Sequence, residues 1–376
     1  MDNGQSRMPK RERLSTLWLC KARYMNHDVA ADRYARLFEL PHRMSEDFSL
    51  QAICLDYRVS GSEPVPQGLS ATWRQLNLPR TLMLGWLLQL YTLARKVSPR
   101  VVIASSDCLC VIIGYWLARL TGARFYADLY DDYSTFGLAR LPGVKPLYRR
   151  ALSKADGLSA VSRTLVADLE REFPGKPMLL LESTVDPRVF HPREQRLCRQ
   201  ELGLGQLSDK KFVGVCGGLN NHHGAGTIFE AIPEFEQSDP DVVFVIAGKV
   251  YEECPLPRGP NVVYLGMLPH HSMPKFYSAM DVVVVPLSNT RFGYYAFPQK
   301  AYEVIACDVP AVVADVGALA QLFEALPQAR YSPDSVSGLA ACIRYQLEHA
   351  ERPDVPVPTW AEQAEKLLVF TSAGER

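Results

Sequence analysis

The chain has 376 residues, of which 47% are hydrophobic and 22% are charged, and its formal net charge is zero. That length accommodates two domains, and that composition is ordinary for a globular enzyme. The charge is uneven: residues 1–182 hold 25 Lys and Arg against 18 Asp and Glu (+7), and residues 183–376 hold 16 against 23 (−7). Unless this asymmetry is a chance difference between two ordinary domains, we expect only the first half to meet an anionic surface. We expect no nucleic-acid partner.

The nine cysteines are odd in number and irregularly spaced, which favours reduced thiols in the cytoplasm over a disulfide framework. The histidine pairs at 222–223 and 270–271 lack the three or four converging ligands that a metal needs, so we expect no metal site. The longest uncharged run, residues 81–94, is shorter than the roughly 20 residues that span a bilayer. The polar segment before Leu14 predicts no signal peptide.

From the N-terminus onward, short apolar runs alternate with helical patterns, which is typical of a doubly wound parallel sheet. In the first half we expect strands at 15–20, 49–57, 101–104, 124–129, 157–161 and 178–181, and helices at 33–42, 79–97, 109–121, 146–154 and 164–173. In the second half we expect strands at 212–216, 242–247, 261–265, 282–285 and 311–314, and helices at 227–235, 272–280, 298–307, 335–349 and 359–370.

The segment from residue 281 to 315 carries the clearest chemical signal. A buried strand leads into a polar and aromatic loop, and Pro298 suits the first position of the helix that follows. The free N–H groups of a helix start bind phosphate, and Lys300 adds a positive charge there. Glu303 lies one turn further and can accept hydrogen bonds from two ribose hydroxyls. An exposed Lys–Glu pair, worth about 0.2–0.5 kcal/mol, fits the spacing equally well.

This segment resembles the donor site of the retaining glycosyltransferases of family 4, which have the GT-B fold. Their usual pattern has two glutamates eight positions apart; Glu303 matches the second, and Tyr295 stands in place of the first. A subgroup carries Phe-Pro-x-Lys-x-x-Glu instead, and Phe297, Pro298, Lys300 and Glu303 match that form. We include Tyr295 in the predicted donor site. Because a tyrosine stands where the usual pattern has its first glutamate, the donor sugar and the stereochemistry of transfer stay open.

The resemblance extends to residues 155–162 and 180–190, which are similar to the interdomain passage of the same family. It implies an α/β fold with two Rossmann-like domains facing a cleft. Residues 1–182 would bind the acceptor, and residues 183–350 would bind the nucleotide sugar. Residues 351–376 are expected to form a C-terminal helix that crosses back to the first domain.

A second part of the predicted donor site follows the strand at 212–216. The loop Gly-Gly-Leu-Asn-Asn-His-His-Gly-Ala-Gly precedes a helix, so its backbone N–H groups can cradle a phosphate. The candidates here are Gly217, Gly218, Asn220 and His223. In the family two of these positions usually carry Arg and Lys; here they hold Gly218 and His223, which leaves the anion mainly to Lys300. Lys249 follows the next strand and is a further candidate, with a plain turn and an exposed lysine as the alternatives.

An acidic loop ends the strand at 124–129, on the domain that would bind the acceptor. A carboxylate there can take the proton that the acceptor hydroxyl loses during transfer. Asp131 is the first candidate for this catalytic base and Asp128 the second, because Tyr130 aligns with a histidine that the family often has. A helix cap or a solvated turn is the alternative for both.

A basic face is predicted on the first domain, around the helix at 146–154. Its members are Lys145, Tyr148, Arg149 and Arg150, together with Arg80, Arg95, Lys96, Lys10, Arg11 and Arg13. Basic amphipathic elements lie on anionic bilayers, and a solvated helix face is the alternative. We therefore expect a cytoplasmic protein that contacts the inner face of the cytoplasmic membrane peripherally.

Together these features predict a glycosyltransferase that moves a sugar from a nucleotide-diphosphate sugar to a glycan or lipid-linked acceptor in cell-surface polysaccharide synthesis. No bound cofactor is expected, because the helix start and side chains offset the charge of the leaving diphosphate. Two alternatives stay open: a catalytically silent GT-B subunit that scaffolds polysaccharide assembly, and a nucleotide-sugar epimerase on the same fold.

Overall fold

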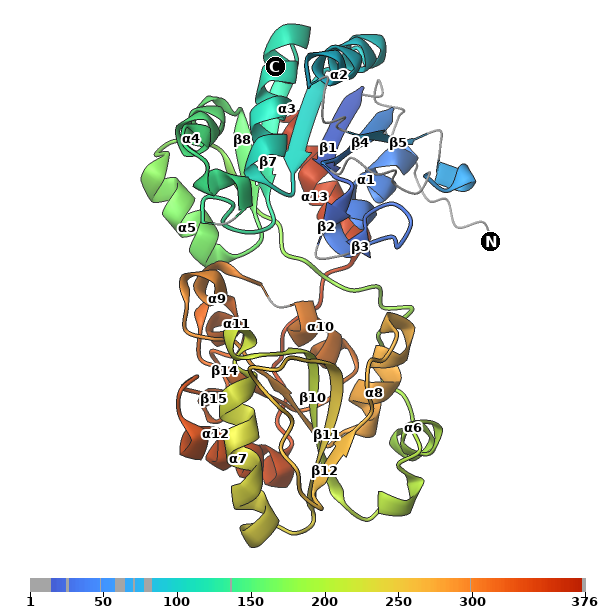
Figure 1. The fold of residues 1–376 in the computed structure, drawn as a ribbon, viewed down its shortest axis with the longest axis vertical. Coiled ribbons are helices and arrows are strands. Elements are labelled where there is room, and N and C mark those ends of the chain that lie inside the picture. The colour runs from blue at the N-terminus through green and yellow to red at the C-terminus, as the bar shows by residue number, and fades with distance from the viewer. Residues whose placement is uncertain are drawn as a thin grey trace, which may run out of the picture. The chain divides into compact units, whose positions relative to one another are not determined.

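The computed structural model describes residues 15–24, 27–47, 49–57, 65–69, 72–77, 83–135, 137–297 and 299–373. The chain divides into two compact units, one made of Met1–Glu182 with Trp360–Arg376 and the other of Ser183–Thr359. Each unit is built around one parallel β-sheet with helices packed against it (Figure 1). The predicted α/β class is confirmed.

The sheet of the first unit has the order β5-β4-β1-β6-β7-β8-β9. Its strands are β1 (Thr16–Lys21), β4 (Leu50–Asp56), β5 (Trp73–Asn77), β6 (Val101–Ser105), β7 (Arg124–Leu129), β8 (Gly157–Ala160) and β9 (Met178–Leu180). A small antiparallel pair, β2 (Arg23–Tyr24) and β3 (His27–Asp28), follows β1. The strand order reverses between β1 and β6, and ligands of doubly wound sheets bind at the carboxyl ends of the strands beside such a reversal.

The helices of the first unit cover both faces of this sheet (Figure 1). They are α1 (Ala35–Asp47), α2 (Met83–Val97), α3 (Cys108–Thr121), α4 (Val144–Lys154), α5 (Arg163–Glu172) and α13 (Trp360–Ser372). Right-handed crossovers place α2, α3, α4 and α5 on one face of the sheet and α1 on the other. The reason is that α1 leads from β1 to β4, toward the β5 edge, whereas the other four helices lead toward the β9 edge. The C-terminal α13 packs against α1, so it shares the α1 face.

The core under α1 depends on residues that are far apart in the sequence. Trp18 of β1 and Trp73 of β5 are fully buried there, and the Phe38 ring stacks on Trp73 with centroids 5.1 Å apart. Trp360 and Leu367 of α13 belong to the same cluster. The last helix of the chain therefore completes the core of the unit with which the chain begins.

The sheet of the second unit has the order β12-β11-β10-β13-β14-β15. Its strands are β10 (Lys211–Leu219), β11 (Val242–Val250), β12 (Val262–Tyr264), β13 (Val282–Val285), β14 (Ala311–Ala314) and β15 (Arg330–Tyr331). Its helices are α6 (Gln195–Glu201), α7 (Ala225–Ser238), α8 (Met273–Ala279), α9 (Arg291–Tyr295), α10 (Gln299–Ala306), α11 (Gly317–Leu322) and α12 (Val336–His349). The order reverses between β10 and β13, so the carboxyl end of β10 is the expected ligand position.

Several elements of the second unit differ from the sequence-based expectation, which lacks α6, α11 and β15 altogether. β10 continues past residue 216 to Leu219, because it pairs in register with β11 as far as Val250. Glycines at 217 and 218 concealed this extension, since glycine is depleted in strands. A short helix, α9, lies inside the expected loop, and the Thr290 hydroxyl caps it by accepting a hydrogen bond from Gly293 N at 3.2 Å.

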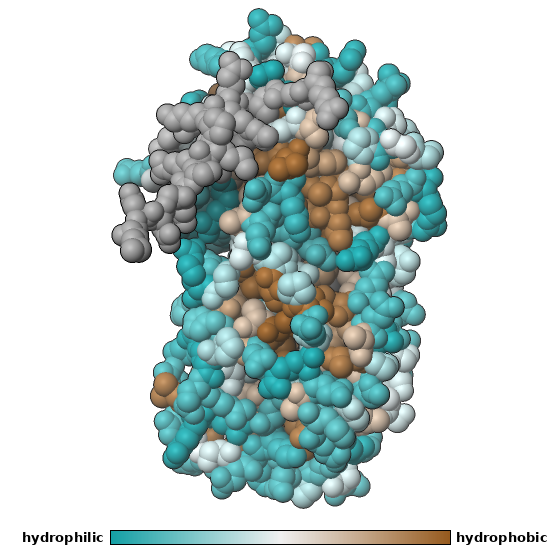
Figure 2. Space-filling view, turned by 180° about the vertical axis from the view of Figure 1, so that it is seen from behind, coloured by the Kyte–Doolittle hydropathy of each residue, from teal (hydrophilic) through white to brown (hydrophobic). Residues whose placement is uncertain are grey.

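The surface of the chain is mixed in character. Figure 2 shows one face that is largely hydrophilic, on which hydrophobic residues gather in separate patches. Within the described ranges, no helix has the length and apolar character needed to cross a bilayer.

Candidate functional site

Two glycines at the carboxyl end of β10 allow the backbone and one side chain to approach closely. Gly217 and Gly248 face each other in the β10–β11 register, with φ of 113° and 129°. A Cβ on Gly248 would lie 2.9 Å from the carbonyl carbon of Gly217. A Cβ on Gly217 would lie 2.8 Å from Cε of Lys300 and closer still to its Nζ. Only glycine fits either position.

Lys300 uses the space that Gly217 leaves. It lies in the first turn of α10, and its half-buried Nζ donates a hydrogen bond to the backbone oxygen of Cys216 at 2.9 Å. This bond fixes the ammonium group at the end of β10, beside the strand-order reversal. An ammonium group has three N–H donors, so one bond to a carbonyl leaves capacity for an anion.

Glu303 lies one turn further along α10 and is almost completely buried, at 6% exposure. Its Oε2 accepts a hydrogen bond from the Tyr277 hydroxyl at 2.6 Å, and Nε2 of His270 lies 3.7 Å from Oε1. The hydrogen bond to Glu303 raises the pKa of His270 above its ordinary value, although burial opposes the shift. The carboxylate is therefore held in place by a phenol from α8 and an imidazole just before it.

The sequence reasoning did not place Tyr277 or His270 in this site. His270 was considered only as half of a possible metal pair, and Tyr277 reads as an ordinary apolar position of α8. No short-range signal connects either residue to Glu303, which lies 26 or more positions away. A polar side chain in the segment between a strand and a helix, such as His270 between β12 and α8, is the one feature that could have drawn attention.

His223 and Asn220 form the turn that follows β10. The Asn220 side chain caps this turn by accepting a hydrogen bond from His223 N at 2.9 Å. Burial lowers the pKa of His223, and the positive charge of Lys300 lowers it further. The imidazole is therefore neutral at pH 7 and lies next to Gly218, whose Cβ would be 3.1 Å from Nδ1 of His223. The structure brings five of the predicted residues together: Gly217, Gly218, Asn220, His223 and Lys300.

The remaining predicted donor-site residues lie differently. Tyr295 is buried in α9 with the guanidinium of Arg291 5.6 Å from its ring centroid, and Phe297 packs on Tyr302 at 4.8 Å. Both aromatic side chains thus contribute to packing. Lys249 was expected to follow a strand, but it lies within β11. Its side chain is exposed, and its Nζ is 4.9 Å from the ring centroid of Tyr251. Pro298 lies outside the described residues.

Asp128 in the first unit does not fit the predicted role of a base. It is fully buried at the end of β7 and forms an ion pair with Arg36 of α1. Nε of Arg36 donates to Oδ2 at 3.1 Å, and the hydroxyls of Ser105 and Ser159 donate to the same carboxylate at 2.9 and 2.6 Å. A carboxylate whose oxygens are occupied by charged and neutral donors is unavailable to an acceptor hydroxyl, so Asp128 is a structural residue.

Asp131 has a different environment, three residues further on. Its side chain is mostly buried, and Oδ1 accepts a hydrogen bond from Asp132 N at 2.7 Å. Burial raises the pKa of Asp131 to about 7, and the neighbouring charge of Asp132 adds to the shift. A carboxyl that titrates near neutral pH is suited to accept and release protons.

The strand reversal of the first unit also places an ion pair that the sequence reasoning missed. Lys21 ends β1 and Asp107 follows β6, and Nζ of Lys21 lies 3.7 Å from Oδ2 of Asp107. The same ammonium group is 5.6 Å from the ring centroid of Tyr57. Each of these residues ends or follows a strand, and only the order of the strands reveals that they are neighbours.

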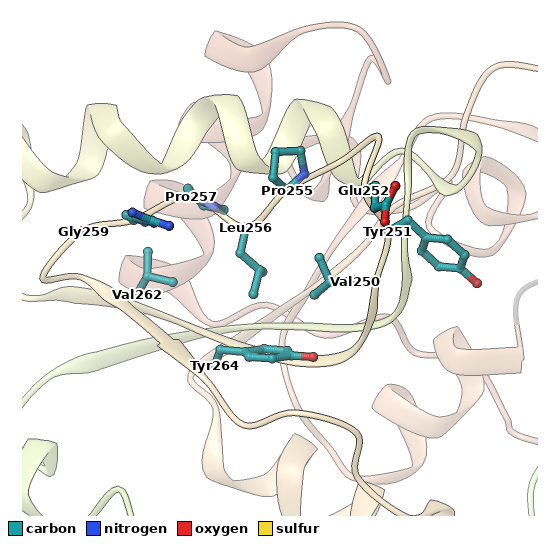
Figure 3. A pocket seen from close by; sticks show the side chains of 10 residues that line it. Val250, Tyr251, Glu252, Pro255, Leu256, Pro257, Gly259, Val262 and Tyr264 are labelled. Atoms are coloured by element: carbon teal, nitrogen blue, oxygen red, sulfur yellow. The ribbon is translucent and has the colours of Figure 1, made fainter.

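A hollow of about 700 Å³ lies on the second unit, next to Lys249 in the sequence (Figure 3). Its lining residues are Val250, Tyr251, Glu252, Pro255, Leu256, Pro257, Arg258, Gly259, Val262 and Tyr264. The ring of Tyr264 forms one wall, and its hydroxyl donates to Gly248 O at 2.7 Å. Over the described part of the chain, no group of three or more His, Cys, Asp and Glu side chains is arranged to hold a metal ion.

Comparisons with known proteins agree on the class. Residues 210–349 match the family model described as Glycosyl transferases group 1. Among solved structures, HepE of Anabaena in complex with UDP superposes with a TM-score of 0.69 at 13% identity, over 94% of both chains. The chain therefore has the GT-B type of α/β fold, and its second unit carries a domain of the group 1 glycosyltransferase type.

Curated relatives point the same way. A candidate teichuronic acid biosynthesis glycosyltransferase, TuaC of Bacillus subtilis, is 26% identical over 61% of this chain and 54% of its own length. The 2-deoxystreptamine glucosyltransferase of Streptomyces kanamyceticus is 22% identical over 67% of both chains. The chain spans about half the length of most of the curated relatives it matches. Both of these relatives are named as sugar transferases.

Proposed function

We propose that the chain is a glycosyltransferase that transfers a sugar from a nucleotide-diphosphate sugar to a glycan or lipid-linked acceptor in cell-surface polysaccharide synthesis. The observation that carries this proposal is the position of Lys300 at the end of β10, fixed by Cys216 O beside Gly217. Two comparisons support it. TuaC is named as a glycosyltransferase of teichuronic acid biosynthesis, and HepE has been solved in complex with UDP and with UDP-glucose.

In this proposal the second unit, with residues 183–350, holds the donor. Lys300 and the backbone after β10 bind the diphosphate, which gains a further negative charge as its bond to the sugar breaks. Glu303 accepts hydrogen bonds from the ribose, with its orientation fixed by Tyr277. The segment from Phe297 to Glu303 then corresponds to the Phe-Pro-x-Lys-x-x-Glu form of family 4. Tyr295, buried under Arg291, replaces the first glutamate of the usual pattern.

The first unit, with residues 1–182, binds the acceptor in this proposal, and residues 351–376 complete it. Asp131 is the base: it takes the proton of the acceptor hydroxyl as that oxygen bonds to the anomeric carbon and the nucleotide diphosphate departs. Water is a competing acceptor, so a well-oriented acceptor hydroxyl limits hydrolysis. We place the protein in the cytoplasm, in peripheral contact with the inner membrane face.

The experiment compares donor binding and turnover in matched variants. Lys300→Met should weaken binding of a UDP-sugar at least about tenfold, the usual loss when one charge-assisted contact to phosphate is removed. Glu303→Gln should weaken it less, because the amide still accepts one hydrogen bond. Lys249→Met is the control and should bind normally, since Lys249 lies on Tyr251. Thermal shift with a panel of nucleotide sugars measures binding, and acceptor-dependent release of nucleotide diphosphate measures transfer.

A catalytically silent subunit is the second candidate, because Gly218 and His223 replace two cationic residues and Tyr295 replaces an acid. It predicts donor binding without release of nucleotide diphosphate under any acceptor condition. If Lys300→Met binds every nucleotide sugar as well as the unchanged protein does, the donor site is not at Lys300, and both the active-transferase proposal and the silent-subunit alternative have located it wrongly.

A further inference from the structure

Three neighbouring helices of the first unit form a surface without acidic residues. The helices α2, α3 and α4 lie on the same face of the sheet, with α2 packed against α3 and α3 against α4. None of the three contains Asp or Glu. They contain seven basic residues: Arg95, Lys96, Arg119, Lys145, Arg149, Arg150 and Lys154. We call this surface the α2–α4 face.

The same face exposes large hydrophobic side chains. Leu88 of α2 is 64% exposed, and Trp116 and Leu120 of α3 are 47% and 56% exposed. Leu87 of α2, Leu147 of α4 and Leu141 just before α4 are exposed as well. Among the described residues of the first unit, only Val369 of α13 is a comparably exposed large hydrophobic residue elsewhere. Gathering six such residues on one face is unusual for a surface that meets only water.

The structure also changes which residues can belong to the basic face that the sequence predicts around residues 146–154. Tyr148 is buried, so it does not contribute an exposed aromatic ring, whereas Trp116 does. Lys10, Arg11, Arg13 and Arg80 lie outside the described residues. Arg149 pairs with Glu172 of α5 at 2.7 Å, so α5 forms the border of the acid-free region.

We propose that the α2–α4 face docks onto an anionic lipid bilayer, with its leucines and Trp116 in the headgroup boundary and its basic residues against lipid phosphates. Interfacial helices combine these two features: apolar side chains enter the boundary, and Lys and Arg meet the acidic headgroups. An anionic bilayer matches this face by charge, because its headgroups are acidic throughout, whereas a protein partner would need acidic residues placed to match the seven basic ones. This inference specifies the proposed membrane contact and does not depend on the donor chemistry.

The test is sedimentation of the full chain with vesicles of phosphatidylcholine, with and without phosphatidylglycerol, that contain no glycolipid acceptor. Binding is expected only with phosphatidylglycerol, and it should weaken as salt is added. Leu88→Glu combined with Trp116→Glu should reduce partitioning more than about tenfold, because two apolar contacts are lost and two repulsive charges are gained. Lys96→Glu with Arg119→Glu should do the same.

Val369→Glu is the matched control, since it places the same charge at an exposed apolar position on α13, on the opposite face of the same sheet. It should leave vesicle binding unchanged. The inference is overturned if the protein stays in the supernatant with anionic vesicles, or if the control and the α2–α4 variants lose binding equally. The same variants should show the same thermal shift with a UDP-sugar as the unchanged protein does. Loss of vesicle binding with an unchanged thermal shift therefore concerns the membrane contact alone and leaves the proposed activity untouched.

Discussion

At the scale of single residues, the two acidic candidates of the first unit show how environment decides chemistry. Asp128 and Asp131 are three positions apart and are both buried. Asp128 has a guanidinium and two hydroxyls around it, so both of its carboxylate oxygens already have partners. Asp131 has mainly a backbone N–H, and burial keeps its pKa near 7. A pKa near 7 lets Asp131 change its protonation near neutral pH.

The first prediction concerns Asp131→Asn. We expect this variant to lose transfer while keeping donor binding, because Asn cannot take a proton. In the unchanged protein, kcat/KM should fall as the pH drops below about 7, since a protonated carboxyl is no base. Asp132→Asn is the control: its Oδ1 caps Ser134, and an amide oxygen caps equally well, so most activity should remain. Normal turnover by Asp131→Asn would remove Asp131 from the mechanism.

The same variant tests the pKa shift through stability. A carboxyl whose pKa is raised by folding stabilises the fold only while it is protonated, so its contribution is complete below about pH 4 and is lost as the pH rises through about 7. Asp131→Asn should therefore raise the thermal midpoint relative to the unchanged protein, and it should do so clearly more at about pH 8.5 than at about pH 5, where only part of the stabilisation has been lost. An equal change at both pH values would contradict the raised pKa.

At the scale of elements, one buried ion pair connects several parts of the first sheet. Arg36 of α1 pairs with Asp128 of β7, and it also donates to the backbone oxygen of Leu181 after β9. Asp128 in turn accepts from Ser105 of β6 and Ser159 of β8. Hydrogen bonding compensates the cost of burying both charges, and the network fixes α1 over the carboxyl ends of three strands.

The second prediction follows from this network. Arg36→Leu leaves the Asp128 carboxylate buried without its cation, which should lower the free energy of unfolding by about 3–5 kcal/mol. Combining it with Asp128→Asn should recover part of the loss, because the unpaired charge is gone. Glu172→Gln, which breaks the exposed pair with Arg149, is the control and should cost less than about 1 kcal/mol. Denaturant unfolding measures all three; a small effect of Arg36→Leu would mean that water reaches Asp128.

At the scale of the whole molecule, the chain leaves the first unit at Glu182 and returns to it at Trp360. The returning helix α13 buries Trp360, Ala364 and Leu367 in the core under α1. The stability of the first unit therefore depends on residues that follow the entire second unit in the sequence.

The third prediction uses this connection. Trp360→Ala should destabilise the first unit by about 3–5 kcal/mol, the usual cost of removing a large aromatic side chain from a core. Hydrogen exchange should accelerate in β1 and β4 and stay unchanged in β10 and β13. Val369→Ala, at an exposed position of the same helix, should change stability by less than about 0.5 kcal/mol. Equal acceleration in both sheets would show that the two units unfold together.

Much of the fold could be read from local patterns. The β-branched run of β13 and the alternation of strands and helices predicted two parallel sheets, because continuous apolar runs are stable only when both faces are covered. The end of β10 could not be predicted, since Gly217 and Gly218 belong to a strand only through pairing with β11. The short helix α9 was missed for a similar reason: five residues with a Thr cap give too little signal.

The candidate site was predictable to a smaller extent. Lys300 and Glu303 could be proposed because they occupy one helix face after a strand, which is a local relation. Their neighbours Tyr277, His270 and Cys216 O come from other elements, and no sequence spacing indicates those contacts. The same holds for Arg36, whose partner Asp128 is 92 positions away.

The sequence by itself determined the α/β class, most strand positions and the residues of the helix that starts the candidate donor site, because periodicity, helix starts and apolar runs act over a few neighbouring residues. The tertiary structure alone decided that Asp128 is structural while Asp131 titrates near neutral pH, that Tyr148 is buried, and that six exposed hydrophobic residues share an acid-free face. Those properties depend on burial and on partners from distant segments, which only the packed chain brings together.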